Sequence, residues 1–133
     1  IHTTRHIADN CLSVFFQQMG PGFGYATDLG DVAHYYRQQE RLKAHWQACF
    51  GDNLHTVRYE ELIASPEAVL RGVLDYLELD WDDGVLEAEQ DGTRVRTASI
   101  WQVRQPVHSG SQGRWANYRS LVEAVPELAD ATR

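Results

Sequence analysis

The fold is decided by the first 19 residues of the chain, IHTTRHIADNCLSVFFQQM. Ile1–Thr4 is a short run bounded by a change of pattern, and we expect it to be the end of a strand. Asp9–Met19 carries apolar residues at spacings of three and four, which predicts a helix, and Asp9 is placed to cap or charge its first turn. The apolar face of that helix consists of Leu12, Phe15, Phe16 and Met19.

Further along, the chain alternates between helical and strand patterns. We expect a second helix from about Leu29 or Gly30 to Phe50, a strand at Leu54–Arg58, and a helix that begins at Ser65-Pro66. This alternation is typical of an α/β domain with a parallel sheet. Two strands are too few for a stable sheet of this type, so we expect further strands upstream of Ile1. The expected buried stripe of the second helix is Val32, Tyr35, Tyr36, Leu42, Trp46 and Cys49.

Charge is unevenly distributed along this acidic chain, whose net charge is −7. Residues 75–91 carry eight acidic side chains and no Lys or Arg, whereas residues 93–119 carry five arginines and no acidic side chain. A guanidinium is a planar fork of donors that suits phosphate and carboxylate. The arginine-rich stretch therefore indicates either a site for a small anionic ligand or a solvated basic face that pairs with the acidic block.

Composition also excludes several classes of protein. The net negative charge argues against nucleic acid as a partner. No apolar run approaches the ~20 residues needed to cross a bilayer, and we expect a cytoplasmic protein without a membrane segment. Cys11 and Cys49 lie in apolar helical stretches and are expected to be reduced core thiols. No Cys or His cluster has the spacing of metal ligands, so no metal is expected.

A first candidate site lies where the first strand meets the first helix. Arg5 follows the strand, and Ser13 lies in the first turns of the helix, one turn before Gln17. Backbone N–H groups and the helix dipole favour a negative charge at such a junction. The alternative is that Ser13 is an ordinary solvated serine on a helix flank.

Three segments resemble sulfotransferases. Residues 5–13 resemble the 3′-phosphate-binding motif of that family, in which a Ser follows an Arg by eight positions. Residues 57–62, VRYEEL, resemble the family's segment after a core strand. Residues 95–107, followed by Gly113-Arg114-Trp115, are similar to a stretch of protein-tyrosine sulfotransferases. The three segments occur in the family's order and span nearly the whole chain, which is closest to bacterial sulfotransferases resembling the tyrosylprotein type.

The resemblance implies a site for the sulfate donor 3′-phosphoadenosine 5′-phosphosulfate (PAPS), with adenosine 3′,5′-bisphosphate as product and no metal. It implies that Arg5 and Ser13 hold the ribose 3′-phosphate, that Tyr59 lies against the adenosine, and that a loop from Ser99 to His108 lines the nucleotide. The complete set of implied donor-binding residues is Arg5, Ser13, Tyr59, Ser99, Gln102, Arg104, His108 and Arg114. The tyrosylprotein group has Arg and Lys where this chain has Gln17 and Gln105, which implies a less charged site.

The implied fold is the C-terminal portion of a P-loop NTPase-like sulfotransferase fold, mostly helical in this chain, with one or two parallel strands. Residues 1–133 would then form a partial domain without the phosphosulfate-loop half, and no catalytic residue is assigned. We expect the intact protein to transfer a sulfuryl group to an unknown hydroxyl acceptor, and the isolated fragment to be inactive and to self-associate or pair with the missing N-terminal half. The alternative is a non-catalytic module that binds a phosphorylated nucleotide or another protein.

Overall fold

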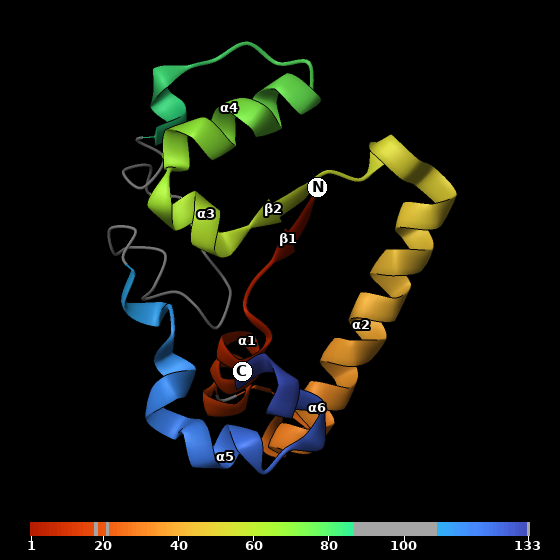
Figure 1. Cartoon of the computed structure of the whole chain (residues 1–133). Coiled ribbons are helices and arrows are strands. Elements are labelled where there is room, and N and C mark those ends of the chain that lie inside the picture. Colours follow the sequence, from red (N-terminus) through yellow and green to blue (C-terminus); the bar gives the residue numbers. More distant parts are fainter. Residues whose placement is uncertain (18, 21, 87–108, 133) are drawn as a thin grey trace. The chain divides into compact units, whose positions relative to one another are not determined.

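The computed structural model describes residues 1–17, 19–20, 22–86 and 109–132, and its contacts divide the chain into two compact units (Figure 1). The first unit consists of Ile1–Thr4 and His55–Ser109, and the second consists of Arg5–Leu54 and Gly110–Arg133. Each unit therefore joins segments that lie far apart in the sequence.

The first unit contains a two-stranded parallel sheet. Strand β1, His2–Thr4, pairs with β2, Thr56–Arg58, in a register that places Thr3 opposite Val57. The predicted strands are confirmed, although β2 begins two residues later than expected. The described part of the chain is mostly helical with these two parallel strands, which is consistent with an α/β class. The helices of this unit are α3 (Tyr59–Ala64), α4 (Pro66–Tyr76) and the 3-10 helix η3 (Asp83–Leu86).

The second unit is helical. Its long elements are α1, Ile7–Phe16, and α2, Leu29–Phe50. The C-terminal segments, drawn in blue, return to pack beside α1 and the first turns of α2 (Figure 1). The short elements are η1 (Gly24–Thr27), η2 (Gly51–Asn53), η5 (Ser109–Ser111), η6 (Arg114–Tyr118), α5 (Arg119–Glu123), α6 (Pro126–Ala129) and η7 (Asp130–Thr132).

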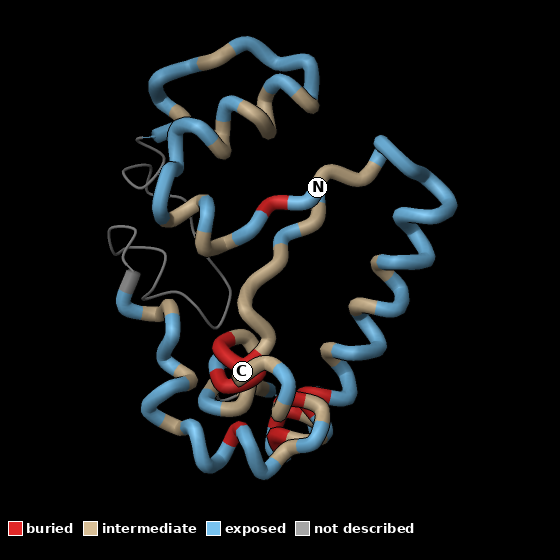
Figure 2. The backbone as a smooth tube through the Cα atoms, in the orientation of Figure 1, coloured by how far each residue is buried: buried red, intermediate tan, exposed pale blue. Residues whose placement is uncertain are grey.

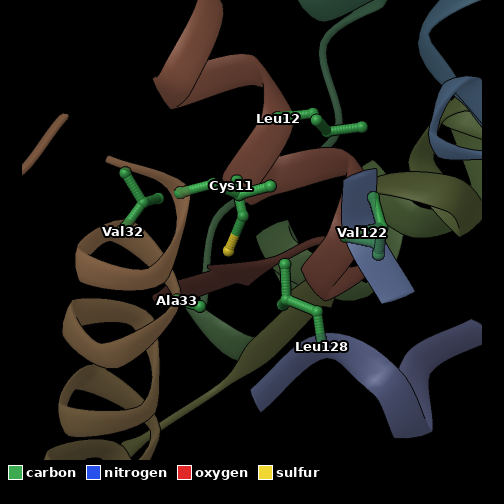
Figure 3. Close-up of a cluster of buried hydrophobic side chains, with 8 residues drawn as sticks. Cys11, Leu12, Val32, Ala33, Val122 and Leu128 are labelled. Carbon is green, nitrogen blue, oxygen red and sulfur yellow. The ribbon is translucent and has the colours of Figure 1, made fainter. Parts of the chain in front are cut away.

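One cluster of buried side chains holds the second unit together. It combines residues of α1, α2, α5 and α6, which Figure 3 shows in close-up. The cluster consists of Ala8, Cys11, Leu12, Leu29, Val32, Ala33, Val122 and Leu128. Because it contains residues from both ends of the chain, this cluster fixes the C-terminal segments against α1.

Helix α2 begins and ends as predicted, but most of its expected apolar stripe is not buried. The Asp28 carboxylate accepts the Asp31 N–H at 3.0 Å at the start, and Gly51 adopts a left-handed φ of 53° at the end. Only Leu29, Val32 and Ala33 are buried, and the later turns are exposed (Figure 2). The predicted core positions Tyr35, Leu42, Trp46 and Cys49 are exposed. The prediction of two core thiols is therefore correct for Cys11 and wrong for Cys49.

Helix α1 is shifted toward the N-terminus relative to the prediction. It ends at Phe16 rather than Met19, because the backbone of Gln17 turns to an extended conformation with ψ 126°. Phe16, expected on the buried face, is 42% exposed. Within the described ranges, no helix combines the length and the apolar character needed to cross a membrane.

Candidate anion-binding site

Arg5 lies between the end of β1 and the start of α1, and hydrogen bonds hold it at both its backbone and its side chain. Its guanidinium Nη2 donates to the backbone carbonyl of Ser111, and the hydroxyl of Tyr36 donates to its own carbonyl at 3.2 Å. Arg5 therefore connects the start of α1 to α2 and to a segment 106 positions further along the chain.

Asp9, in the first turn of α1, makes a second connection to the same segment. Its carboxylate accepts the backbone N–H of Gly113 at 2.7 Å and that of Trp115 at 2.8 Å. The residue is buried, with 4% of its surface exposed. Bonds in which the acceptor is ionised are shorter and stronger than neutral ones. Asp9 thus anchors the start of η6 to α1.

Arg114 lies between the two N–H groups that Asp9 holds. The preceding residue, Gly113, has φ 65°, a left-handed conformation that glycine adopts without strain. The guanidinium carbon of Arg114 is 5.3 Å from the ring centroid of Phe16 and 6.0 Å from that of Tyr118. An arginine at these distances from aromatic rings is attracted to them electrostatically. The guanidinium of Arg114 therefore lies beside the partly exposed ring of Phe16.

Ser13 is exposed and lies on the same face of α1 as Asp9 and Phe16, since residues three and four apart in a helix are neighbours. Ser13 therefore lies on α1 between Asp9, which bonds to the backbone beside Arg114, and Phe16, whose ring lies beside the Arg114 guanidinium. The three predicted phosphate-binding residues all belong to the second unit: Arg5 and Ser13 to its N-terminal segment, and Arg114 to the C-terminal segment that is hydrogen-bonded to it.

The other predicted site residues are not placed with these three. Tyr59 belongs to the first unit, where it is half-buried at the start of α3 directly after β2. Ser99, Gln102, Arg104 and His108 lie outside the described residues. Their roles therefore remain predictions.

Two residues with a part in this site were missed by sequence reasoning. Asp9 was expected only to cap or charge its own helix, whereas its carboxylate bonds to residues 104 and 106 positions away. The ring of His6 stacks on Trp115, with centroids 5.7 Å apart and planes 15° apart. The sequence offered one signal for the role of Asp9: this acidic residue lies next to Ala8 and one helical turn before Leu12, two apolar residues that the structure buries.

The described part of the chain contains no arrangement of three or more His, Cys, Asp or Glu side chains that suits a metal ion. Burial raises the pKa of the Cys11 thiol to about 12, and the nearby charge of Arg37 lowers it less than burial raises it. Cys11 is therefore protonated at neutral pH and has the properties of a core residue, because the thiolate is the reactive form.

Comparison with known proteins shows the family of this chain. The model of the sulfotransferase family matches residues 1–83. The chain belongs to the sulfotransferase family. The matched part of this chain includes Arg5, Ser13 and Tyr59, whereas Arg114 lies beyond it. The bonds of Arg5 and Asp9 attach the segment of Arg114 to the matched part.

A curated protein of Aquifex aeolicus (strain VF5), described as an uncharacterized protein, is 31% identical to this chain over 131 residues. The similarity covers 96% of this chain and 17% of that protein. The chain therefore spans less than a fifth of the length of this relative.

Proposed function

We propose that this chain forms the 3′-phosphate and adenosine side of the donor site in a sulfotransferase that uses PAPS. The observation that supports this most strongly is that Arg5 and Asp9 both fasten the segment carrying Arg114 to the start of α1. Two arginines and a serine hydroxyl, on α1 or on segments joined to it, supply the positive charge and the hydrogen-bond donors that a phosphate requires.

In this proposal the ribose 3′-phosphate binds to Ser13 and to the guanidinium groups of Arg5 and Arg114. Tyr59 lies against the adenosine, and the loop residues Ser99, Gln102, Arg104 and His108 line the nucleotide. The support for these five residues is the resemblance of their segments to sulfotransferases. The neutral Gln17 and Gln105 reduce the positive charge of the site relative to the tyrosylprotein type.

The reaction is a sulfuryl transfer from PAPS to a hydroxyl acceptor. The bond between sulfur and the bridging phosphate oxygen breaks, a bond forms between sulfur and the acceptor oxygen, and a base takes the hydroxyl proton. Adenosine 3′,5′-bisphosphate leaves. Such a transfer needs stabilisation of the moving group and a base, and no residue of this chain is assigned to either role. We propose that residues 1–133 are part of a larger domain whose preceding half supplies both, and that the fragment alone is inactive.

Helix α2 carries exposed apolar residues through which the chain could associate with another protein surface. The exposed residues Tyr35, Leu42, Trp46 and Phe50 follow one face of α2. Large apolar side chains exposed along one helix face are typical of an interaction surface. We propose that it is covered by self-association or by the remainder of a longer protein.

The proposed donor site is tested by thermal unfolding of the intact protein with adenosine 3′,5′-bisphosphate. A ligand that binds only the folded state stabilises it by about 2.7 kcal/mol at a concentration one hundred times the Kd. We expect a higher Tm for the wild type and a much smaller increase for Arg114→Ala. Arg41→Ala is the matched control, because it removes one exposed positive charge whose hydrogen bond, to Gln38, lies within α2. No increase in the wild-type Tm at saturating ligand would exclude the proposed site.

A further inference from the structure

We infer that Asp9 is a positioning residue, which holds Arg114 in its binding position before any ligand arrives. The identity of the ligand rests on the proposed function, whereas the positioning itself rests on contacts within the second unit. Neither the resemblance nor the family match assigns this role to Asp9.

The carboxylate of Asp9 is placed to fix the backbone on both sides of Arg114. Oδ2 accepts the N–H of Gly113 at 2.7 Å, and Oδ1 accepts the N–H of Trp115 at 2.8 Å. Each oxygen takes one donor, so both are needed. The group is 96% buried, and α1 holds it in a regular helical turn. A buried, bidentate and charge-assisted contact restrains the attached segment strongly.

This restraint fixes the position of the Arg114 Cα atom, from which the side chain extends. A residue between two anchored N–H groups has little freedom to move its Cα, and the left-handed Gly113 sets the direction in which η6 begins. From that position the guanidinium reaches to 5.3 Å from the ring centroid of Phe16, which belongs to the same helix as Asp9. One helix therefore fixes both the backbone and the end of the arginine side chain. An arginine placed in advance loses less conformational freedom when it binds.

The same two bonds also reduce an electrostatic cost. A carboxylate close to a phosphate site repels the phosphate, and in a buried setting this repulsion is poorly screened. The N–H dipoles of Gly113 and Trp115 point at the carboxylate and offset part of its charge. Asparagine cannot do this, because it has one acceptor oxygen and its NH₂ group would face a backbone N–H.

The experiment compares Asp9→Asn with Asp28→Asn in the intact protein. Asp28 is a matched control, because its carboxylate also accepts a backbone N–H, that of Asp31 at 3.0 Å, at the start of α2. Two readouts are needed: amide hydrogen exchange of Gly113 and Trp115 without ligand, and the ratio of the dissociation constants for adenosine 5′-monophosphate and adenosine 3′,5′-bisphosphate. This ratio measures the contribution of the 3′-phosphate.

We expect Asp9→Asn to accelerate exchange at both amides and to lower the ratio by about tenfold, which corresponds to the loss of a hydrogen bond to a charged group. Asp28→Asn should leave both readouts unchanged. Faster exchange with an unchanged ratio would show that Asp9 only stabilises the fold, and unchanged exchange would refute the contact itself. If the wild type does not distinguish the two nucleotides, the proposed function fails, whereas the exchange data still decide whether Asp9 holds the segment.

Gly113→Ala tests the same inference if Asp9→Asn does not fold. An alanine Cβ at this position meets no atom within 4 Å, so the substitution acts through the unfavourable φ of 65° alone. We expect it to displace the segment while the Asp9 carboxylate stays intact, and to lower the ratio in the same direction. A ratio equal to that of the wild type would contradict the inference.

Discussion

The guanidinium of Arg5 donates a hydrogen bond to the backbone carbonyl of Ser111, 106 positions away in the sequence. An arginine expected to bind phosphate therefore also fastens the segment that carries a second such arginine, Arg114. Binding and local structure share one side chain at this point, so substitutions of Arg5 should affect both.

Replacement of Arg5 by alanine should weaken nucleotide binding and loosen the 111–115 segment at the same time. A hydrogen bond to a charged group contributes about 1.5–3 kcal/mol, so we expect roughly a ten- to a hundredfold increase in the Kd for adenosine 3′,5′-bisphosphate. Isothermal titration calorimetry measures this change. Arg5→Lys keeps the charge but not the planar fork, and we expect an intermediate Kd. Equal Kd values for Arg5→Ala and the wild type would remove Arg5 from the proposed site.

The buried cluster of the second unit should be sensitive to the removal of side-chain volume. Leu128 in α6 is fully buried, with 0% exposed surface, whereas Leu121 in α5 is 39% exposed. We expect Leu128→Ala to lower the free energy of unfolding by about 2–5 kcal/mol, because it leaves a cavity, and Leu121→Ala by clearly less. Urea unfolding measures both. Similar losses for the two variants would mean that α6 does not pack as described.

The helices that the sequence predicted well are those with strong local signals at their ends. Helix α2 runs from Leu29 to Phe50 as expected, because the carboxylate of Asp28 caps its start and Gly51 ends it. The start of α4 at Pro66 is likewise set locally, since proline suits the first position of a helix. Helix α3, which directly follows β2, was not predicted, because the sequence has no turn residue between them.

Burial and long-range contacts were much harder to predict. Trp46 has the spacing of a buried residue yet is 43% exposed, because the buried residues of α2 are confined to its first turns. Arg5 and Ser13 were identified first from their place at the junction of a strand and a helix, and the resemblance to sulfotransferases added Arg114. The role of Asp9 could not be identified in the same way, because its partners are backbone N–H groups, which any residue type presents.

The two thiols should differ in reactivity. Cys11 is buried with a pKa of about 12, whereas Cys49 is exposed near the end of α2. We expect a maleimide at pH 8 to modify Cys49 in the folded protein and to modify Cys11 only after unfolding, because the thiolate is the nucleophile. Peptide mapping by mass spectrometry distinguishes the two sites. Rapid modification of Cys11 in the folded protein would contradict its place in the core.

The exposed face of α2 should drive association rather than folding. We expect the double substitution Leu42→Gln and Trp46→Gln to weaken self-association of the isolated chain while the free energy of unfolding changes by less than about 1 kcal/mol, because both side chains are exposed. Multi-angle light scattering measures the first quantity and urea unfolding the second. The control is Gln38→Ala together with Gln47→Ala, two exposed polar positions of the same helix. A monomeric wild-type chain at high concentration would argue against self-association through this face.

Binding of a 3′-phosphate by Arg5, Ser13 and Arg114 is tested most directly by calorimetric titration of the intact protein with two nucleotides that differ only in that phosphate. We predict that adenosine 3′,5′-bisphosphate binds at least about tenfold more tightly than adenosine 5′-monophosphate, and that Arg114→Ala removes most of this difference. Equal affinities for the two nucleotides in the wild type, or a preference that survives Arg114→Ala unchanged, would contradict the account.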